Sequence, residues 1–373
     1  MIYLDNAATT AVYPECNELI AFFNSERFFN PSALYGPAAE VSAAVKAARQ
    51  NLLGHLGGGG SGRLIFTASG SEADNIALSC RSFKKGSRII ISMTEHAAVY
   101  NAALSLKQKG FDVEVCPTDS FGRVDLQKFG ELLSPDTALV SIVHVGNETG
   151  AVNDIETVVK MSKRVNRDCI VHSDGVQAFK KIDVNVARLG VDLYSVSGHK
   201  IHAPKGVGAL YVKNGINVNA FIHGGGQEGG VRSATENVSG IAAFSLAADV
   251  MDKRTIDRRL LRELKDFLTA NFDVIINTPD DDINAVLSVA FAGVGGEVLL
   301  HCLERHGIIV GTGSACSSKK GGKRIADALG LAPRYSEGIL RISINENTSR
   351  DEILFLQDKL RLETAGLTDG KRQ

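Results

Sequence analysis

The stretch ALVSIVHVGNETGAVNDIETVVKMSKRVNRDCIVHSDG (138–175) decides the fold class of this chain. It begins and ends with a strand candidate rich in apolar residues, 138–145 and 169–175, and a helix-length amphipathic segment, 154–165, lies between them. Strands that are apolar on both faces are typical of a parallel sheet covered by helices. The stretch therefore predicts a strand–helix–strand unit of an α/β domain.

Stretches of the same kind fill the chain up to about residue 250. Strand candidates alternate with helix-length segments, and several of the strands are apolar on both faces. Together with the first two, the further strands predict a large, mostly parallel, seven-stranded sheet with ligand loops at the carboxyl ends of its strands. The further strand candidates are 63–69, 88–92, 112–117, 192–198 and 207–213, and the further helical segments are 71–83 and 96–109.

The sequence changes in character after about residue 250. A long charged amphipathic helix is predicted over 251–272, and a second helix over 296–306. We therefore expect a large α/β domain over 12–250 and a smaller α+β domain over 251–373, with residues 1–11 packing alongside the smaller one. The strand-like segments of the smaller domain are DVIINT (273–278), AVLSVAFAG (285–293) and LRISI (340–344).

Composition excludes several classes of protein. The 373 residues carry 41 lysines and arginines against 42 aspartates and glutamates, and a net charge of −1 argues against a whole-chain nucleic-acid or membrane-surface binder. A hydrophobic share of 44% excludes a mostly disordered chain. There is no basic stretch followed by an apolar core at the N-terminus, no run of 18 apolar residues, and no C-x-x-C pair among the six cysteines. These features predict a cytoplasmic protein with free thiols.

Two glycine-rich motifs occur in the wrong context for a nucleotide. GGGGSG (57–62) and GGGQEG (224–229) both contain G-x-G-x-x-G. The first follows a predicted helix and precedes a strand, and the second comes after the predicted sheet is complete, so neither favours a dinucleotide. The nine histidines show no H-E-x-x-H or comparable ligand spacing, so we predict no metal site.

Two polar residues at strand ends suggest a cofactor. Lys200 directly follows the strand 192–198, where a partly desolvated lysine can form a Schiff base with a carbonyl group. Taken alone, such a lysine is more often a surface residue that opens a loop. Asp174 lies at the end of the strand 169–175, as a helix cap or as the partner of a buried cation. Together they match what pyridoxal phosphate requires, a lysine for its aldehyde and a carboxylate for its ring nitrogen.

The segment SGSE (69–72) opens a predicted helix directly after a strand. The backbone N–H groups and hydroxyls of Gly70 and Ser71 could therefore bind a phosphate group. A plain helix cap formed by Ser71 and Asp74 is the alternative, and it does not exclude the phosphate role.

Cys316 differs from the other cysteines because it lies in GTGSACSSKKGGKR (311–324), which is rich in glycine and serine and lacks apolar periodicity. A cysteine on such a loop is uncommon unless its reactivity is used, and the nearby basic residues favour the thiolate. An incidental loop cysteine is the alternative. Arg341 is of the residue type that binds a substrate carboxylate with two hydrogen bonds, and a structural ion pair is equally compatible with the sequence.

With these motifs the chain resembles the cysteine desulfurases, a group of fold-type I pyridoxal-phosphate enzymes related to class V aminotransferases. The resemblance covers nearly the whole length and depends on ten specific motifs. They are YLDNAATT (3–10), NPSALYG (30–36), FTASGSEADN (66–75), EHAAV (95–99), GNETG (146–150), HSDGVQ (172–177), SVSGHKIHAPKG (195–206), GGGQEGGVRSATEN (224–237), GSACSS (313–318) and LRIS (340–343).

The resemblance implies a role for individual residues. In catalysis, Lys200 is implied to hold pyridoxal 5′-phosphate as an internal aldimine, His96 to stack on its ring and move protons, and Cys316 to accept sulfur. Asn147 and Arg341 are implied to bind the substrate carboxylate. The cofactor-binding residues that it implies are Gly70, Ser71, His96, Asp174 (ring nitrogen), Gln177 (phenolic oxygen), Ser197, His199 and Lys200, with Thr235 contributed across the interface of a homodimer.

The implied reaction converts L-cysteine to L-alanine and places the sulfur on Cys316 as a persulfide. The long segment from Cys316 to Gly330 resembles that of desulfurases that serve iron–sulfur cluster assembly or tRNA thiolation, so a protein acceptor is implied. We expect the basic KKGGKR (319–324) to recognise that acceptor, and we expect no membrane and no direct nucleic-acid partner. A selenocysteine lyase, another class V enzyme, or an inactive cofactor-loaded assembly partner are the alternatives.

The sequence departs from the family motifs at four positions. Tyr35 replaces a usual His, Gly146 a usual Asn, Ala203 a usual Gly and Ala234 a usual Gly. We expect all four near the cofactor or the dimer contact, where they would affect substrate tuning more than reaction type.

Overall fold

The computed structural model describes residues 1–280, 285–313 and 319–369. Within them, seven strands form one sheet in the order β2-β8-β7-β6-β5-β3-β4. Every pair in it is parallel except the two made by β8, which runs antiparallel to β2 and β7. The predicted large, mostly parallel sheet is therefore confirmed. Its strands are β2 (Gly62–Thr67), β3 (Arg88–Ser92), β4 (Asp112–Cys116), β5 (Thr137–Ser141), β6 (Ile170–Asp174), β7 (Leu193–Ser197) and β8 (Gly208–Lys213).

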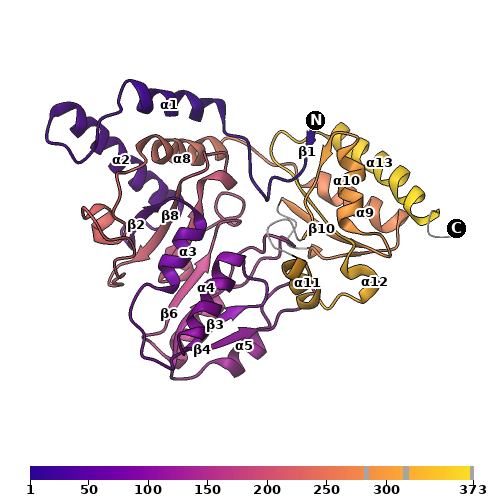
Figure 1. Cartoon of the computed structure of the whole chain (residues 1–373), viewed down its shortest axis with the longest axis horizontal. Helices are drawn as coiled ribbons and strands as arrows, with labels where there is room; N and C mark the ends of the chain where they lie inside the picture. The colour runs from indigo at the N-terminus through magenta and orange to yellow at the C-terminus, as the bar shows by residue number, and fades with distance from the viewer. Residues whose placement is uncertain (281–284, 314–318, 370–373) are drawn as a thin grey trace.

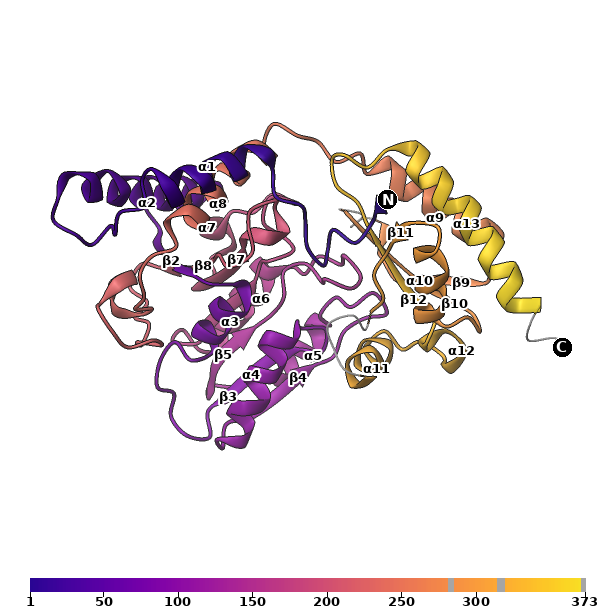
Figure 2. The same cartoon turned by 45° about the horizontal axis from the view of Figure 1, so that its top comes forward.

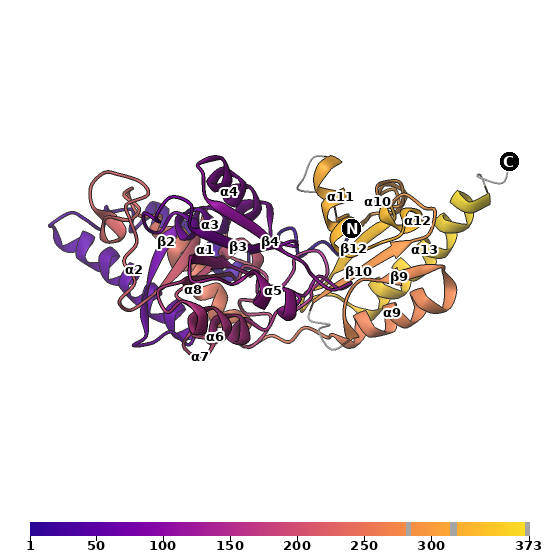
Figure 3. The same ribbon diagram turned by 90° about the horizontal axis from the view of Figure 1, so that it is seen from below.

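Both faces of this sheet are buried, because its strands carry apolar side chains on both sides. In β3, Ile89 and Ile91 join the core cluster of one face while Ile90 joins the other, as the two-residue period of a strand requires. Burying each of these side chains contributes about 1.5–3 kcal/mol. Helices α3 (Gly70–Leu78) and α4 (Ala97–Gln108) cover one face, and α6 (Ile155–Val165) and α7 (Val186–Leu189) lie across the other (Figure 3).

Three further helices pack at the β2 end of the molecule. They are α1 (Pro14–Ser25), α2 (Gly36–His55) and α8 (Val238–Met251), and α8 contacts both of the others (Figure 2). The remaining helix near the sheet, α5 (Leu126–Leu132), follows β4.

The C-terminal third builds a second, smaller sheet with helices on it (Figure 1). Strands β9 (Val274–Ile276), β10 (Val286–Phe291) and β12 (Ile339–Ser343) are antiparallel in the order β12-β10-β9, and β1 (Ile2–Tyr3) pairs in parallel with β11 (Ile308–Ile309). The domain division at residue 250 stays a prediction. The helices are α9 (Arg259–Asn271), α10 (Gly296–Glu304), α11 (Lys319–Ala328), α12 (Pro333–Ser336) and α13 (Arg350–Asp369).

The predicted helix over 251–272 is wrong in its first part. Residues 252–258 are not helical, and α9 begins only at Arg259. Arg254 instead reaches across to Glu15 and Glu346, and the Asp257 carboxylate accepts a hydrogen bond from the Arg259 amide at 3.2 Å. The charged residues that suggested one continuous helix therefore have other roles. Arg254 forms ion pairs with distant segments, and Asp257 lies at the start of α9.

The N-terminal segment joins the two sheets after β1. The Asn6 amide donates to the Ser343 carbonyl at 2.9 Å, and the Thr10 backbone N–H donates to the His199 carbonyl at 3.0 Å. Residues 7 and 8 therefore lie between the large sheet and the small one, at the mouth of the cavity described next. No helix in the described part of the chain combines the length and apolar character needed to cross a membrane.

Candidate active site

A cavity of about 230 Å³ lies at the carboxyl ends of β5, β6 and β7. This is the position at which parallel α/β sheets bind ligands, because several strand ends and helix N-termini meet there. Ten of the sequence-predicted residues line it, and residues 7 and 8 of the N-terminal segment complete the wall. The ten are Gly70, Ser71, His96, Asn147, Asp174, Gln177, Ser197, His199, Lys200 and Arg341.

Lys200 lies on a short 3-10 turn (Gly198–Lys200) that begins directly after β7. Its ammonium group donates to the carbonyl oxygens of Ala7 and Ala8, at 2.7 Å each. The strand end thus places the lysine in the cavity, and the N-terminal segment holds its Nζ there. This arrangement excludes the alternative of a surface lysine that only opens a loop.

Asp174 ends β6 and is 4% exposed. Burial raises the pKa of its carboxyl, and the nearby His96, the Val176 amide and Lys200 act in the opposite direction. Burial thus favours the neutral acid, and the neighbouring groups favour the carboxylate. A carboxylate in this position suits a partner that brings a proton, such as a ring nitrogen.

His96 caps the N-terminus of α4. The Ala98 backbone N–H donates to its Nδ1 at 3.2 Å, so Nδ1 is the acceptor and Nε2 carries the proton of the neutral ring. The side chain is held in one orientation by this cap, with the ring in the wall of the cavity.

Asp74 is a site residue that the sequence interpretation did not identify. It lies on α3, is 1% exposed and lines the cavity. Three atoms lie within 4.8 Å of one another: a carboxylate oxygen of Asp74, a carboxylate oxygen of Asp174 and a ring nitrogen of His96. Burial and the Asp174 charge raise the pKa of Asp74 well above its usual value. By distance the three groups could hold a cation, and they also form an acidic end of the cavity. The alternative of a Ser71–Asp74 cap is wrong, because Ser69 caps α3 by accepting from the Glu72 amide at 3.1 Å.

The start of α3 also lines the cavity, where a phosphate site is predicted. A Cβ atom on Gly70 would come within 2.7 Å of a Val176 methyl group, so only glycine lets the helix start approach this wall. Ser71 is exposed in the first turn, and the buried Ser197 hydroxyl has no hydrogen-bond partner among the described residues. These groups leave donors available to a phosphate. His199 lies beside them, and burial together with the Lys200 charge lowers its pKa to about 4.

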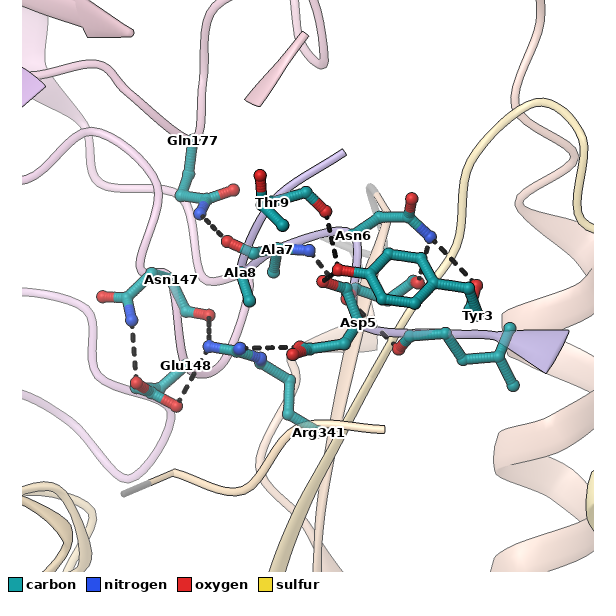
Figure 4. A network of polar contacts seen from close by, with 12 residues as sticks. Tyr3, Asp5, Asn6, Ala7, Ala8, Thr9, Asn147, Glu148, Gln177 and Arg341 are labelled. Carbon is teal, nitrogen blue, oxygen red and sulfur yellow. Dashed lines mark hydrogen bonds and ion pairs between the residues drawn. The ribbon is translucent and has the colours of Figure 1, made fainter. Parts of the chain in front are cut away.

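Arg341, on β12, closes the cavity from the smaller sheet (Figure 4). Its Nη2 contacts Asp5 at 2.8 Å, and its Nη1 donates to the Asn147 carbonyl at 3.1 Å and lies 3.4 Å from Glu148. The Asn147 amide donates to the other Glu148 oxygen at 2.7 Å. The structural ion pair is therefore present, and because the paired guanidinium also lines the cavity, binding of a substrate carboxylate stays a prediction.

Two predicted residues are not part of this wall. Thr235 is exposed in the loop before α8 and does not line the cavity of its own chain, so its predicted contact across a dimer stays a prediction. Cys316 lies outside the described residues. Of the segment's basic residues, Arg324 turns inward: its guanidinium donates to the carbonyl oxygens of Met93 and Glu95 and stacks on the ring of Tyr100.

The four departures from the family motifs do not line the cavity. Tyr35 and Ala234 are exposed, and Ala203 is buried behind the turn that carries Lys200. Gly146 lies in the turn that leads to Asn147, where an added Cβ would be 3.2 Å from the Thr149 hydroxyl. Of the four, Ala203 and Gly146 pack against the backbone that carries Lys200 and Asn147.

Comparisons with known proteins agree over almost the whole chain. Residues 2–356 match the Aminotransferase class-V family. Similar curated proteins are the cysteine desulfurase IscS of Dictyoglomus turgidum, 37% identical over 96% of this chain and 93% of its own, and that of Clostridium botulinum (strain Hall), 34% identical with the same coverage. A NifS-like protein superposes with a TM-score of 0.89 at 32% identity, covering 98% and 99% of the two chains. A NifS-like protein from Rickettsia africae gives 0.87 at 28% identity, covering 99% of each.

Proposed function

Because the chain belongs to the class-V aminotransferase family and, within it, to the cysteine desulfurases, we propose that it removes sulfur from L-cysteine with pyridoxal 5′-phosphate. In the net reaction the carbon–sulfur bond of cysteine breaks, the sulfur joins the Cys316 thiolate as a persulfide, and the carbon gains a proton and leaves as L-alanine. The observation that carries the proposal is the convergence of Lys200, Asp174 and His96 with the start of α3 on one cavity.

The described residues fit the cofactor at both of its charged ends. The start of α3 with the Ser197 hydroxyl, which has no partner among the described residues, suits the phosphate group, and the acidic end at Asp174 suits the ring nitrogen. Lys200, in the same cavity, would hold the aldehyde through Nζ. When bound, the cofactor supplies an electron sink for the bonds broken at the substrate α-carbon.

The chain's own groups then have separate tasks. Arg341 and Asn147 would bind the substrate carboxylate from the side of the smaller sheet. His96 offers Nε2 for proton movement, because its Nδ1 is occupied by the Ala98 amide. The N-terminal segment forms part of the cavity wall and holds Lys200 Nζ through the carbonyl oxygens of Ala7 and Ala8.

The position of the residues beside Cys316 supports its role as sulfur acceptor. A Cβ on Gly313 would lie 3.6 Å from a Glu148 carboxylate oxygen, and Glu148 lines the cavity. On the other side, Arg324 of α11 binds the backbone that leads to His96. Gly313 before Cys316 and Arg324 after it therefore both lie next to residues of the cavity wall or of the backbone beside it.

The proposal includes a homodimer and a protein acceptor. Thr235, exposed in its own subunit, would reach the phosphate site of the second copy. The acceptor would take sulfur from Cys316, in iron–sulfur cluster assembly or tRNA thiolation.

The experiment is an absorbance spectrum of the purified protein with pyridoxal 5′-phosphate, followed by L-cysteine and assays for alanine and sulfide. A Schiff-base absorption band that changes with cysteine, with alanine formed, supports the proposal. A band with no alanine would leave the cofactor site correct and the reaction wrong. A protein that cannot bind the cofactor would contradict both.

Arg341→Lys is expected to lower kcat/KM for L-cysteine by about tenfold to a hundredfold. Lysine keeps the charge but loses the planar fork that binds a carboxylate with two hydrogen bonds, each worth about 1.5–3 kcal/mol when charged. Steady-state alanine formation measures the effect, and the cofactor absorption band should remain. Arg334→Lys, an exposed arginine on α12, is the matched control. Equal kinetics for Arg341→Lys and wild type would remove Arg341 from the substrate site.

Replacing Lys319, Lys320 and Lys323 by glutamine is expected to slow sulfur transfer to an acidic acceptor while sparing alanine formation with a small thiol reductant. Lys323 is exposed, and steering between opposite charges changes association rates more than chemistry. A matched control is the triple change at the exposed Lys84, Lys85 and Lys107, which removes the same charge elsewhere. Equal transfer rates in the two triple variants would show that the basic segment has no specific role.

A further inference from the structure

A second lysine, Lys181, lies behind the wall of the same cavity. It follows β6 in a helical turn, is 9% exposed, and its Nζ donates to the Gln177 side-chain oxygen Oε1 at 2.6 Å. Gln177 in turn lines the cavity and donates from Nε2 to the Ala7 carbonyl at 2.8 Å (Figure 4). Neither the family motifs nor the reaction described above gives Lys181 a task.

The burial of this ammonium group calls for an explanation. No carboxylate of the described residues forms an ion pair with its Nζ, and a buried ammonium without such a partner costs stability. Burial, together with the positive charges of Lys200 and Arg341, lowers the pKa of Lys181 to about 7. A methionine of similar length would avoid this cost, so the position is not explained by packing alone.

The contact with Gln177 supplies a reason. The two ends of a glutamine amide have nearly the same shape, but one only accepts and the other only donates hydrogen bonds. In its protonated form Lys181 has only donors, so the amide beside it presents Oε1 to the lysine, as it does in the structure. Its Nε2 donor is then fixed on the side of Ala7 and the cavity.

The Ala7 carbonyl connects this contact to Lys200. It accepts from both Gln177 Nε2 and Lys200 Nζ, so the two cavity side chains share one acceptor. A reversed Gln177 amide would place its oxygen against that carbonyl and lose the contact. The orientation of Gln177 therefore also affects the N-terminal segment that holds Lys200.

We propose that Lys181 is a positioning residue that fixes the Gln177 amide so that Nε2 stays a donor toward the cavity, ready for the phenolic oxygen of pyridoxal 5′-phosphate. The inference rests on the proposed function in so far as that function places the cofactor in this cavity. Lys181 itself touches neither substrate nor cofactor and acts through Gln177.

The test measures binding of pyridoxal 5′-phosphate to the apoprotein by titration, with the absorption band recorded at saturation. Lys181→Met is expected to weaken binding about tenfold, the effect of losing one well-oriented hydrogen bond to a charged group, and to alter the band. Because a buried ammonium is removed, the melting temperature of the apoprotein should stay level or rise. Lys181→Arg, which again has only donors, should bind more tightly than Lys181→Met.

A double variant separates positioning from general packing. In a Gln177→Leu background, Lys181→Met should weaken cofactor binding no further, because the group it acts on is gone. Full additivity of the two changes, or wild-type affinity in Lys181→Met, would overturn the proposal. If Lys181→Met does not fold, Lys181→Gln can be compared with Lys181→Arg, since a glutamine can also accept and permits the reversed amide. Equal affinity of these two variants would be just as decisive against it.

Cysteine turnover is not part of this measurement. A wild-type protein that binds the cofactor but forms no alanine would therefore contradict the proposed reaction and leave the result on Lys181 intact.

Discussion

Lys200→Ala is expected to lose the Schiff-base absorption band and to lower alanine formation from L-cysteine by at least about 10³-fold, the upper part of the range for a lost acid–base group. Lys200 is the lysine that lines the cavity, and its Nζ is held at 2.7 Å from two carbonyl oxygens of the N-terminal segment. Alanine can replace neither the covalent attachment nor the proton transfer.

The measurement combines the absorbance spectrum with an alanine assay. Lys205→Ala is the matched control, because Lys205 is an exposed lysine only five residues away. It should keep both the band and the activity. A band that survives in Lys200→Ala would place the aldehyde on another lysine, with the buried Lys181 the first to examine. Wild-type turnover in that variant would contradict the assignment of Lys200 altogether.

Much of this site could be predicted because its residues follow strands that the sequence shows clearly. The strand candidate 192–198 predicts β7, and Lys200 and Ser197 then follow from their places at its end. Asp174 follows in the same way from β6. Neighbouring parallel strands bring such ends to one edge of the sheet, so spacing along the chain was enough to predict convergence.

Asp74 could not be predicted in the same way, because its importance depends on what surrounds it in space. One signal was present: an acidic residue on the apolar face of α3, between the buried Ala73 and Ile76. A charge on a buried helix face needs a partner or a proton, and this one lies next to Asp174 and His96.

Contacts between distant segments left even less signal. Arg341 and Asp5 are 336 residues apart, so no local pattern joins them. The helix predicted over 251–272 failed for a related reason. A charged amphipathic pattern does not reveal that Arg254 is drawn away from a helix by Glu15 and Glu346.

Cys316→Ala is expected to lower multiple turnover of L-cysteine by at least about 10³-fold while leaving cofactor binding intact. The thiolate is the nucleophile that would take the sulfur, and a methyl group cannot replace it. The other five cysteines are buried in the structure, so they offer no substitute. Burial raises the pKa of Cys16 to about 11 and that of Cys80, Cys116 and Cys169 to about 12, so they stay protonated at neutral pH.

The assay follows alanine formation, and mass spectrometry follows the addition of one sulfur atom to the protein. Cys302→Ala is the control, because Cys302 lies buried on α10 and should not take sulfur. In wild type and in the control the added sulfur should map to Cys316. Undiminished alanine formation by Cys316→Ala would mean that sulfur leaves the substrate without a protein thiol, as expected of a lyase. In that case the cavity would be correctly assigned but the persulfide step would be wrong.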